Sequence, residues 1–253
     1  MIGFLNVNKP AGPSSHDMVH QVRRLVGRGV KVGHAGTLDP FAQGVLVACI
    51  GPACRLAEYI QAQPKKYQAQ IILGATSDTD DPTGVIAPMT GATAPLQADI
   101  ESALRTQVGT IQQIPPAHSA VHIEGRRAYD MARQGLEVNI TARPVEIHEI
   151  RLLAYNYPTL DIEVACGSGT YIRSIARDVG AALGVGGYCA KLIRTQIGPF
   201  SIEQAKKPAD MRIPDDLISP AAGLPDFPSI MLNERDILTI RYGKKVLLAN
   251  PAV

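Results

Sequence analysis

The pattern of apolar and polar positions predicts a chain that mixes short strands with amphipathic helices. An unbroken apolar run from Val45 to Ile50 is typical of a buried strand. Residues 66–74 alternate with the period of two that a half-buried strand requires. The expected strands are residues 5–8, 45–50, 66–74, 145–154 and 160–166, and the expected helices are residues 15–27, 55–63, 96–107, 129–134 and 171–183.

The first of these helices has the clearest boundaries. Ser14 or Ser15 can cap its start, because a serine hydroxyl accepts a hydrogen bond from a free backbone amide of the first turn. Gly27 or Gly29 marks its end. The apolar positions that repeat at helical spacing are Met18, Val22, Leu25 and Val26.

The order of the elements predicts the fold class. Hairpin-like pairs of strands are mixed with helices, which favours an α+β fold over a doubly wound parallel sheet. We expect a largely antiparallel mixed sheet flanked by helices. Residues 1–213 are expected to form the main domain, the proline-rich residues 214–228 a linker, and residues 229–253 a segment too short to fold alone.

Length and composition support a globular protein. The chain has 253 residues, of which 45 % are hydrophobic, and this is enough for a sizeable core. Its longest apolar run is far too short to cross a bilayer, and Met1 to Phe4 lack the basic start of a secretory signal. We therefore expect a cytoplasmic protein without a membrane partner.

The spacing of potential metal ligands does not favour a metal site. The four cysteines include no Cys-x-x-Cys pair, and three of them have neighbours that suggest buried thiols. His118 and His122 lack a third ligand at a familiar spacing. Asp78, Asp80 and Asp81 lack the pattern of a calcium loop, so a solvated or arginine-paired loop is favoured there.

Basic residues are concentrated in two segments, although the net charge of the chain is only +2. Residues 1–66 contain eight Lys or Arg against three acids, and residues 171–213 contain seven against three. The two segments could form one cationic face that binds phosphate groups, or they could be ordinary solvated surface charge. The sequence leaves both interpretations open.

One loop is expected to display a carboxylate instead of burying it. Gly33 and Gly36 precede Asp39 and Pro40 follows it, and these residue types fix a turn in which the backbone can approach a ligand. An acid between such a loop and a buried strand is rigidly held yet reachable, which suits a nucleophile or a general base. The alternative is an aspartate that only closes its own turn.

Four other places carry side chains with suitable chemistry, namely Lys9-Pro10, Lys66-Tyr67, Gly169 to Arg173, and Leu192 to Arg194. An arginine beside a carboxylate favours its ionised form, so Asp39 paired with Arg173 would be a poised anion. Tyr67 could stack on a planar base. Taken singly, Tyr67 and Leu192 are better explained by a place in the core, and Arg173 by a place on the surface.

These places occur together in segments that closely resemble the TruB family of tRNA pseudouridine synthases. The resemblance runs from about residue 2 to residue 200, and the segment around Asp39 is highly specific. The matching segments are Asn8 to Ser15, Gly33 to Pro40, Lys66-Tyr67, Gln113 to Ala120, Tyr129 to Gly135 and Gly169 to Ser174.

The resemblance implies the pseudouridine synthase fold and the conversion of uridine 55, in the T-arm of tRNA, to pseudouridine. It implies no metal and no organic cofactor, and we expect a monomer. By this resemblance Asp39 is the catalytic residue and Arg173 pairs with it. Tyr67 would stack on the target uracil and assist the final proton transfer.

The same resemblance suggests residues that contact or support the substrate. His34 would help to extrude the target nucleotide, and Leu192 would line an apolar pocket. Lys9 and Pro10 would support the active site from the side. Gly36 and Tyr171 belong to the matching segments and are expected at the substrate.

The chain departs from the family pattern at two places. His122 stands where the family commonly has a lysine, which affects an expected RNA contact. Residues 228–248 resemble only the beginning of the PUA domain with which bacterial members often end. A truncated PUA-like segment is therefore expected at residues 229–253.

The residues suit an isomerisation in which the N1 glycosidic bond breaks and the uracil rejoins the sugar through C5. A single carboxylate could attack the sugar, attack the base or abstract a sugar proton, and the sequence does not choose among these. The nucleotide must first be flipped out of a stacked stem-loop. Two alternatives are a tRNA-folding chaperone that needs no chemistry and a nucleoside-type hydrolase, which needs a second acid near Asp39.

Overall fold

The computed structural model describes residues 1–119, 122–123, 126–134 and 140–246. Its main sheet contains nine strands. In chain order these are β1 (Gly3–Lys9), β2 (Val32–Ala35), β3 (Gln43–Ile50), β4 (Lys65–Leu73), β7 (Gly109–Gln113), β10 (Arg143–Asn156), β11 (Thr159–Cys166), β12 (Gly187–Ile197) and β13 (Phe200–Ser201). Two small hairpins pair β5 (Ala75–Ser77) with β6 (Ile86–Pro88), and β8 (His122–Ile123) with β9 (Arg126–Arg127).

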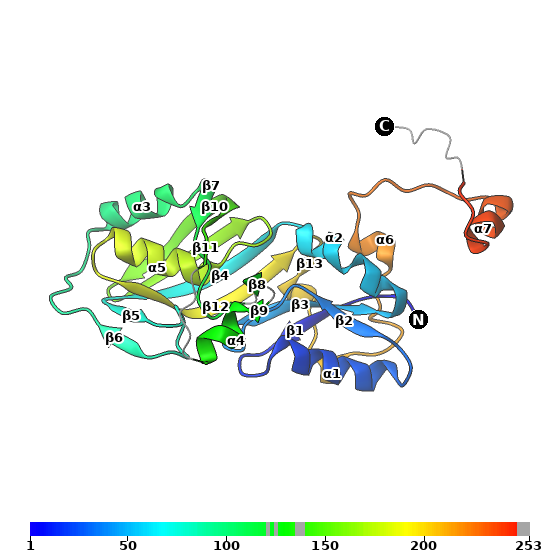
Figure 1. The fold of residues 1–253 in the computed structure, drawn as a ribbon, viewed down its shortest axis with the longest axis horizontal. Coiled ribbons are helices and arrows are strands. Elements are labelled where there is room, and N and C mark those ends of the chain that lie inside the picture. The colour runs from blue at the N-terminus through cyan, green and yellow to red at the C-terminus, as the bar shows by residue number, and fades with distance from the viewer. Residues whose placement is uncertain (120–121, 124–125, 135–139, 247–253) are drawn as a thin grey trace.

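The strand order places distant parts of the chain side by side. The order is β1-β3-β12-β4-β11-β10-β7, with β2 beside β3 and β13 beside β12 (Figure 1). Among the described strands of this sheet, β3 and β12 pair in parallel and the other neighbours are antiparallel. The predicted α+β fold with a largely antiparallel mixed sheet is confirmed.

Helices cover both faces of the sheet. The α-helices are α1 (Ser15–Val26), α2 (Ala57–Ala62), α3 (Gln97–Thr106), α4 (Ala128–Arg133), α5 (Ile172–Ala182), α6 (Pro220–Gly223) and α7 (Glu234–Arg241), and the 3-10 helices are η1 (Gly51–Leu56), η2 (Ile202–Gln204) and η3 (Pro208–Asp210). The larger apolar cluster packs α1, α3 and α5 on one face, and a smaller one packs η1 and α2 on the other. Each expected helix is present within a few residues of its predicted bounds, while the predicted stop at Gly135 lies outside the described residues.

The start of α1 shows how local sequence sets an element. Ser14 is its N-cap and accepts a hydrogen bond from the Asp17 amide, while the Asp17 carboxylate accepts one from the Ser14 amide. This reciprocal arrangement satisfies two amides that the helix itself cannot pair. Ser15, the other predicted cap, is the first helical residue, and its hydroxyl bonds the backbone of Leu38 instead.

Two strands next to the predicted site were missed. The sequence predicted a loop from Gly33 onward, yet β2 begins at Val32 and is too short to show an alternating pattern. No strand was predicted at β12, which lies in the middle of the sheet. Register shifts after Cys189 and after Arg194 interrupt its pairing with β4, so its apolar positions do not keep the period of two on which the prediction depends.

Part of the expected linker packs against the sheet. Phe4 and Ile218 exchange two backbone hydrogen bonds, of 2.8 and 2.9 Å, and Gly223 lies against the Phe4 ring. Farther along, α7 stands away from the sheet (Figure 1), and none of its residues is buried. No helix within the described ranges has the length and apolar character needed to span a membrane.

Candidate active site

Asp39 lies in the connection between β2 and β3, and the loop before β3 was predicted from the sequence whereas β2 was not. Its carbonyl accepts a 3.1 Å hydrogen bond from the Ala42 amide, which closes a turn. The carboxylate is not used in that turn, because its Oδ2 lies 2.9 Å from Nε of Arg173. The Asp39 side chain is 34 % exposed while that of Arg173 is 3 % exposed. The predicted ion pair is therefore present, and its carboxylate is accessible from one side.

The backbone around Asp39 is clamped on both sides of the turn. The Ser15 hydroxyl accepts a 2.8 Å hydrogen bond from the Leu38 amide and donates one of 2.9 Å to the Leu38 carbonyl. The carbonyl of Pro40 accepts hydrogen bonds from the Gly12 amide and from Nζ of Lys9. The loop thus has fixed partners immediately before and after the acid.

Lys9 joins the first turn of the chain to the Asp39 loop. Besides Pro40, its Nζ donates to the carbonyls of Pro10 and Ala42, at 3.0 and 2.6 Å. The side chain is fully buried, and burial lowers the Lys9 pKa to about 8, with Asp39 opposing the shift. Lys9 therefore supports the loop through hydrogen bonds to its backbone, while Pro10 itself is exposed.

Arg173, in the first turn of α5, gathers three separate segments. Besides Asp39, its Nη1 donates to the Thr79 carbonyl at 2.9 Å and lies 3.1 Å from Oδ2 of Asp81, and its Nη2 donates to the His118 carbonyl at 3.0 Å. A planar guanidinium can hold several acceptors at fixed angles. Its Nε is in ion-pair contact with Asp39 but has no hydrogen-bond partner among the described residues.

Asp81 is a second acid close to the site, but its oxygens are already occupied. Oδ1 accepts hydrogen bonds from Thr79 Oγ1, the Thr83 amide and Thr83 Oγ1, while Oδ2 pairs with Arg173. Asp80 pairs with Arg177 at 2.8 Å. The prediction of an arginine-paired acidic loop is confirmed. Because the Asp81 carboxylate is buried and fully paired, it has no free oxygen with which to activate a water.

The pKa of Asp39 reflects burial and neighbouring charges that act in opposite directions. Burial raises the pKa of Asp39 above its usual value of 3.8, and the Arg173 guanidinium opposes that shift without cancelling it. Asp81 adds to the upward shift, whereas Lys9 and Arg194 reduce it. Arg173 favours the ionised form as expected, but removing the carboxylate from water has the larger effect on this pKa.

Tyr67 and Leu192 come from adjacent strands of the sheet. Tyr67, on β4, is 7 % exposed, and Leu192, on β12, is 6 % exposed, and both belong to the larger apolar cluster. Burial raises the pKa of the Tyr67 phenol, and Asp39 contributes to the same shift. Tyr67 thus lies within electrostatic range of the Asp39 carboxylate and keeps its proton at neutral pH.

His34 and Gly36 occupy the approach to the Asp39 loop. His34 lies on β2, burial lowers its pKa, and its Nδ1 has no hydrogen-bond partner among the described residues. Gly36 has φ of 94°, a conformation that side chains disfavour, and its carbonyl accepts a hydrogen bond from Arg194. The imidazole is therefore neutral at physiological pH and retains an unused polar atom.

Tyr171 is the N-cap of α5 and is positioned by a residue that the sequence did not single out. The side-chain amide of Gln113 accepts a 2.8 Å hydrogen bond from the Tyr171 amide and donates one of 3.1 Å to its carbonyl. Arg143 lies over the Tyr171 ring at 5.2 Å. Gln113 is completely buried, so it fixes the backbone two residues before Arg173.

Four of the basic residues in the two basic segments are buried, so they cannot be part of an exposed cationic face. Lys9, Lys65, Arg173 and Arg194 are all buried. One indication in the sequence that Arg194 is buried is that it directly follows the apolar residues Leu192 and Ile193. Ser15 and Asp81 carried no comparable signal, because their roles depend on contacts with distant residues. The side chain of His122 lies outside the described part of the chain.

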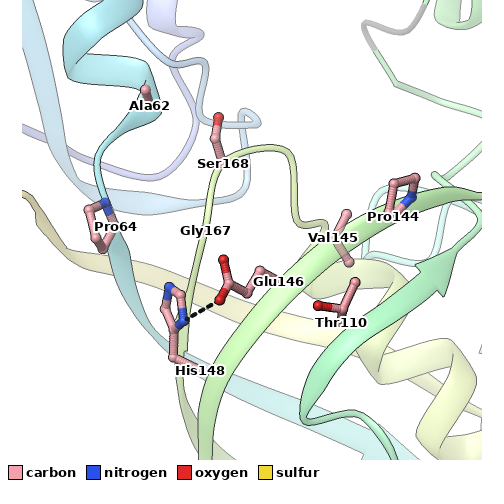
Figure 2. Close-up of a pocket in the computed structure, with 9 residues that line it drawn as sticks. All are labelled: Ala62, Pro64, Thr110, Pro144, Val145, Glu146, His148, Gly167 and Ser168. Atoms are coloured by element: carbon pink, nitrogen blue, oxygen red, sulfur yellow. Dashed lines mark ion pairs between the residues drawn. The ribbon is translucent and has the colours of Figure 1, made fainter.

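A separate open pocket contains none of the predicted site residues. Its volume is about 450 Å³, and it is lined by Ala62, Pro64, Thr110, Pro144, Val145, Glu146, His148, Gly167 and Ser168 (Figure 2). Glu146 and His148 point toward each other from β10, with 3.5 Å between Oε1 and Nδ1. Both are solvent-exposed, so the pair is weak. No group of three or more potential metal ligands occurs among the described residues.

Solved structures share this fold. One chain of a Cbf5-Nop10-Gar1 complex matches 82 % of this chain and 53 % of its own length, with a TM-score of 0.64 and 29 % identity. A chain of the archaeal box H/ACA sRNP Nop10-Cbf5 complex matches 82 % and 52 %, with a TM-score of 0.61 and 27 % identity. This chain thus spans about half the length of those structures. The architecture is that of a pseudouridine synthase.

The sequence comparisons identify the family. The profile of the TruB family pseudouridylate synthase (N terminal domain) matches residues 23–172. The tRNA pseudouridine synthase B of Gloeobacter violaceus is 46 % identical over 207 residues, which are 80 % of this chain and 70 % of that protein. Its counterpart from Moorella thermoacetica is 43 % identical over 242 residues, or 92 % and 79 %. The chain belongs to the TruB family.

Proposed function

We propose that this protein isomerises uridine 55, in the T-arm of tRNA, to pseudouridine, with Asp39 as the catalytic residue. The observation that carries the proposal is the partly exposed Asp39 carboxylate, held 2.9 Å from the buried Arg173 guanidinium in a loop whose backbone is clamped. Relatives named tRNA pseudouridine synthase B support the choice of tRNA as the substrate.

The reaction requires no net gain or loss of atoms. The bond between N1 and the sugar breaks, the uracil turns, C5 forms the new bond to the sugar, and the proton that C5 loses is balanced by one that N1 gains. The Asp39 carboxylate begins this sequence by attacking the sugar or the base, or by removing a sugar proton. Arg173 holds the carboxylate in its reactive orientation throughout.

Tyr67 and His34 have supporting roles in this proposal. The Tyr67 phenol stays protonated at neutral pH, so its ring can stack on the extruded uracil and its hydroxyl can take part in the final proton transfer at C5. The neutral His34, whose Nδ1 has no partner in the described part of the chain, can occupy the gap that the flipped nucleotide leaves. Leu192 supplies an apolar wall, and exposed bases contact the phosphates.

The direct test replaces the carboxylate by an amide of the same shape. Asp39→Asn should lower the rate of pseudouridine formation at least about 10³-fold, because the nucleophile or base is lost, while the dissociation constant for tRNA stays within about threefold. The measurement maps the modified positions in a tRNA transcript after incubation with pure protein. Asp216→Asn is the matched control, since Asp216 is also ion-paired, with Lys206 at 2.6 Å, and its described contacts do not include the Asp39 loop.

Several outcomes would contradict the proposal. Retained turnover by Asp39→Asn removes the catalytic assignment, and a modified position outside the T-arm removes the substrate site. Release of free uracil would indicate a hydrolase. If wild type and Asp39→Asn refold tRNA equally well and neither forms pseudouridine, the protein is a chaperone. The proposal also includes the expectation of a monomeric enzyme that acts in the cytoplasm.

A further inference from the structure

Arg194 is a buried cation that is bound mainly by backbone carbonyls. It lies on the central strand β12 and is 2 % exposed. Its Nε donates to the Val45 carbonyl at 2.8 Å, its Nη1 to Thr37 at 3.4 Å and its Nη2 to Gly36 at 3.0 Å. Within the described ranges, no carboxylate lies at ion-pair distance from it. Two of the three carbonyls belong to the segment that leads directly into Asp39.

The same side chain reaches the strand that carries Tyr67. Arg194 and Tyr67 are register partners in the antiparallel pairing of β12 with β4, and the charge of Arg194 partly offsets the upward shift that burial causes in the pKa of the phenol. On its other side, Arg194 pairs in parallel with Gly44 of β3. A Cβ on Gly44 would stand 2.2 Å from the Arg194 carbonyl oxygen, so a glycine there allows the strands to approach. Arg194 therefore connects the Asp39 loop to Tyr67.

We propose that Arg194 is a positioning residue, which fixes the Asp39 loop and the Tyr67 ring relative to each other without touching the substrate. This inference rests on the proposed function. A guanidinium offers five donors in a rigid plane, whereas a lysine ammonium is a single point on a flexible stem and cannot reproduce that geometry. A displacement of about 1 Å in a reacting group can lower a rate about 100-fold.

The test uses Arg194→Lys, which keeps the charge, and Arg194→Met, which removes it. Both variants should lower the single-turnover rate constant of pseudouridine formation about 100-fold. The dissociation constant for a tRNA transcript should stay within about threefold of wild type, because Arg194 is buried away from solvent. If Arg194→Met does not fold, the rate constant of Arg194→Lys alone tests the inference.

The pH profile separates positioning from a merely structural role. The charged groups that act on Asp39 are Arg173, Lys9, Arg194 and Asp81. Arg194→Met removes one of the three cations, so the acid limb of the rate should move to higher pH. Arg194→Lys keeps a positive charge, so its acid limb should stay near that of wild type although its rate falls.

A second measurement does not depend on activity. In wild type the Leu38 amide bonds the Ser15 hydroxyl and the Ala42 amide bonds the Asp39 carbonyl. Loss of the guanidinium should loosen the loop. Measured in the absence of RNA, both amides should therefore exchange hydrogen faster in the two Arg194 variants than in wild type. Unchanged exchange at both amides would overturn the inference.

Arg177→Lys is the matched control. Arg177 also donates to a carbonyl, that of Ile114 at 2.8 Å, and pairs with Asp80, and its described contacts do not include the Asp39 loop. Its variant should keep the wild-type rate within about twofold. An Arg194→Lys variant as active as wild type, or a loss equal to that of Arg177→Lys, overturns the inference. An inactive wild type instead overturns the proposed function itself.

Discussion

At the scale of single residues, the site combines one accessible acid with several buried cations. Arg173, Lys9 and Arg194 all lower the pKa of Asp39, and each of them also donates to backbone carbonyls. Their positions are therefore fixed by the main chain as well as by the charge of Asp39. Fixed charges of this kind do not have to reorganise during a reaction, which increases their effect on it.

The raised pKa of Asp39 predicts the acid limb of the reaction. Asp39 acts as a carboxylate, so activity should fall as the pH decreases through its pKa. Because burial raises that pKa, half of the activity in kcat/KM should be lost at a pH clearly above 3.8. The measurement is a pH profile of kcat/KM on tRNA, restricted to the range in which the protein stays folded by circular dichroism. A limb at or below 3.8 would contradict this assignment.

At the scale of elements, the first helix is connected directly to the loop that carries Asp39. Ser14 caps α1, whereas Ser15, one residue later, makes two hydrogen bonds to the Leu38 backbone of the loop between β2 and β3. The helix is thus a support on which the Asp39 loop is built. Because Ser14 acts on the helix and Ser15 on the loop, substituting each serine in turn measures the two effects separately.

We predict different outcomes for the two serines. Ser15→Ala leaves two buried polar groups of Leu38 unpaired, so it should lower the free energy of unfolding by about 1–3 kcal/mol and the turnover rate at least about tenfold. Ser14→Ala loses only a helix cap, so it should cost about 1 kcal/mol and leave the rate unchanged. Urea unfolding and single-turnover kinetics measure both. Equal rates in the two variants would show that the clamp does not position the loop.

At the scale of the whole molecule, the site depends on a sheet that brings remote segments together. The Asp39 loop, Tyr67, Arg173 and Arg194 come from both halves of the chain, and two apolar clusters support the sheet on opposite faces. The segment after residue 228 contributes little to this body, because α7 buries none of its residues.

Removal of residues 229–253 should therefore leave the folded body around the sheet intact. We expect the free energy of unfolding to stay within about 0.5 kcal/mol of the full chain, since described side chains of this segment are almost all exposed or half-buried. The single-turnover rate at saturating tRNA should also be unchanged. Urea unfolding and kinetics of the shortened chain are the measurements. A much less stable shortened chain would show that the tail belongs to the folded body.

The sequence by itself predicted five strands, five helices and the turn that carries Asp39, while β12 and the shorter strands were missed. Apolar continuity in β3, alternation in β4 and the serine caps of α1 are local properties, since they depend on residues within a turn or a strand. The exposed turn that carries Asp39 follows from its glycines and proline for the same reason. The partnership of Asp39 with Arg173 came from a family resemblance and not from local pattern.

The tertiary structure alone decided the position of β12, the burial of Arg194 and the direction of the Asp39 pKa shift. The Arg194 side chain bonds the Val45 carbonyl, 149 residues away in the chain, across the parallel pair of β12 and β3. Register shifts in the antiparallel pairing of β12 with β4 hide the strand pattern of β12. Likewise, the cost of removing Asp39 from water depends on everything packed around it. Desolvation and long-range pairing exist only once the chain has folded, because distant segments supply both.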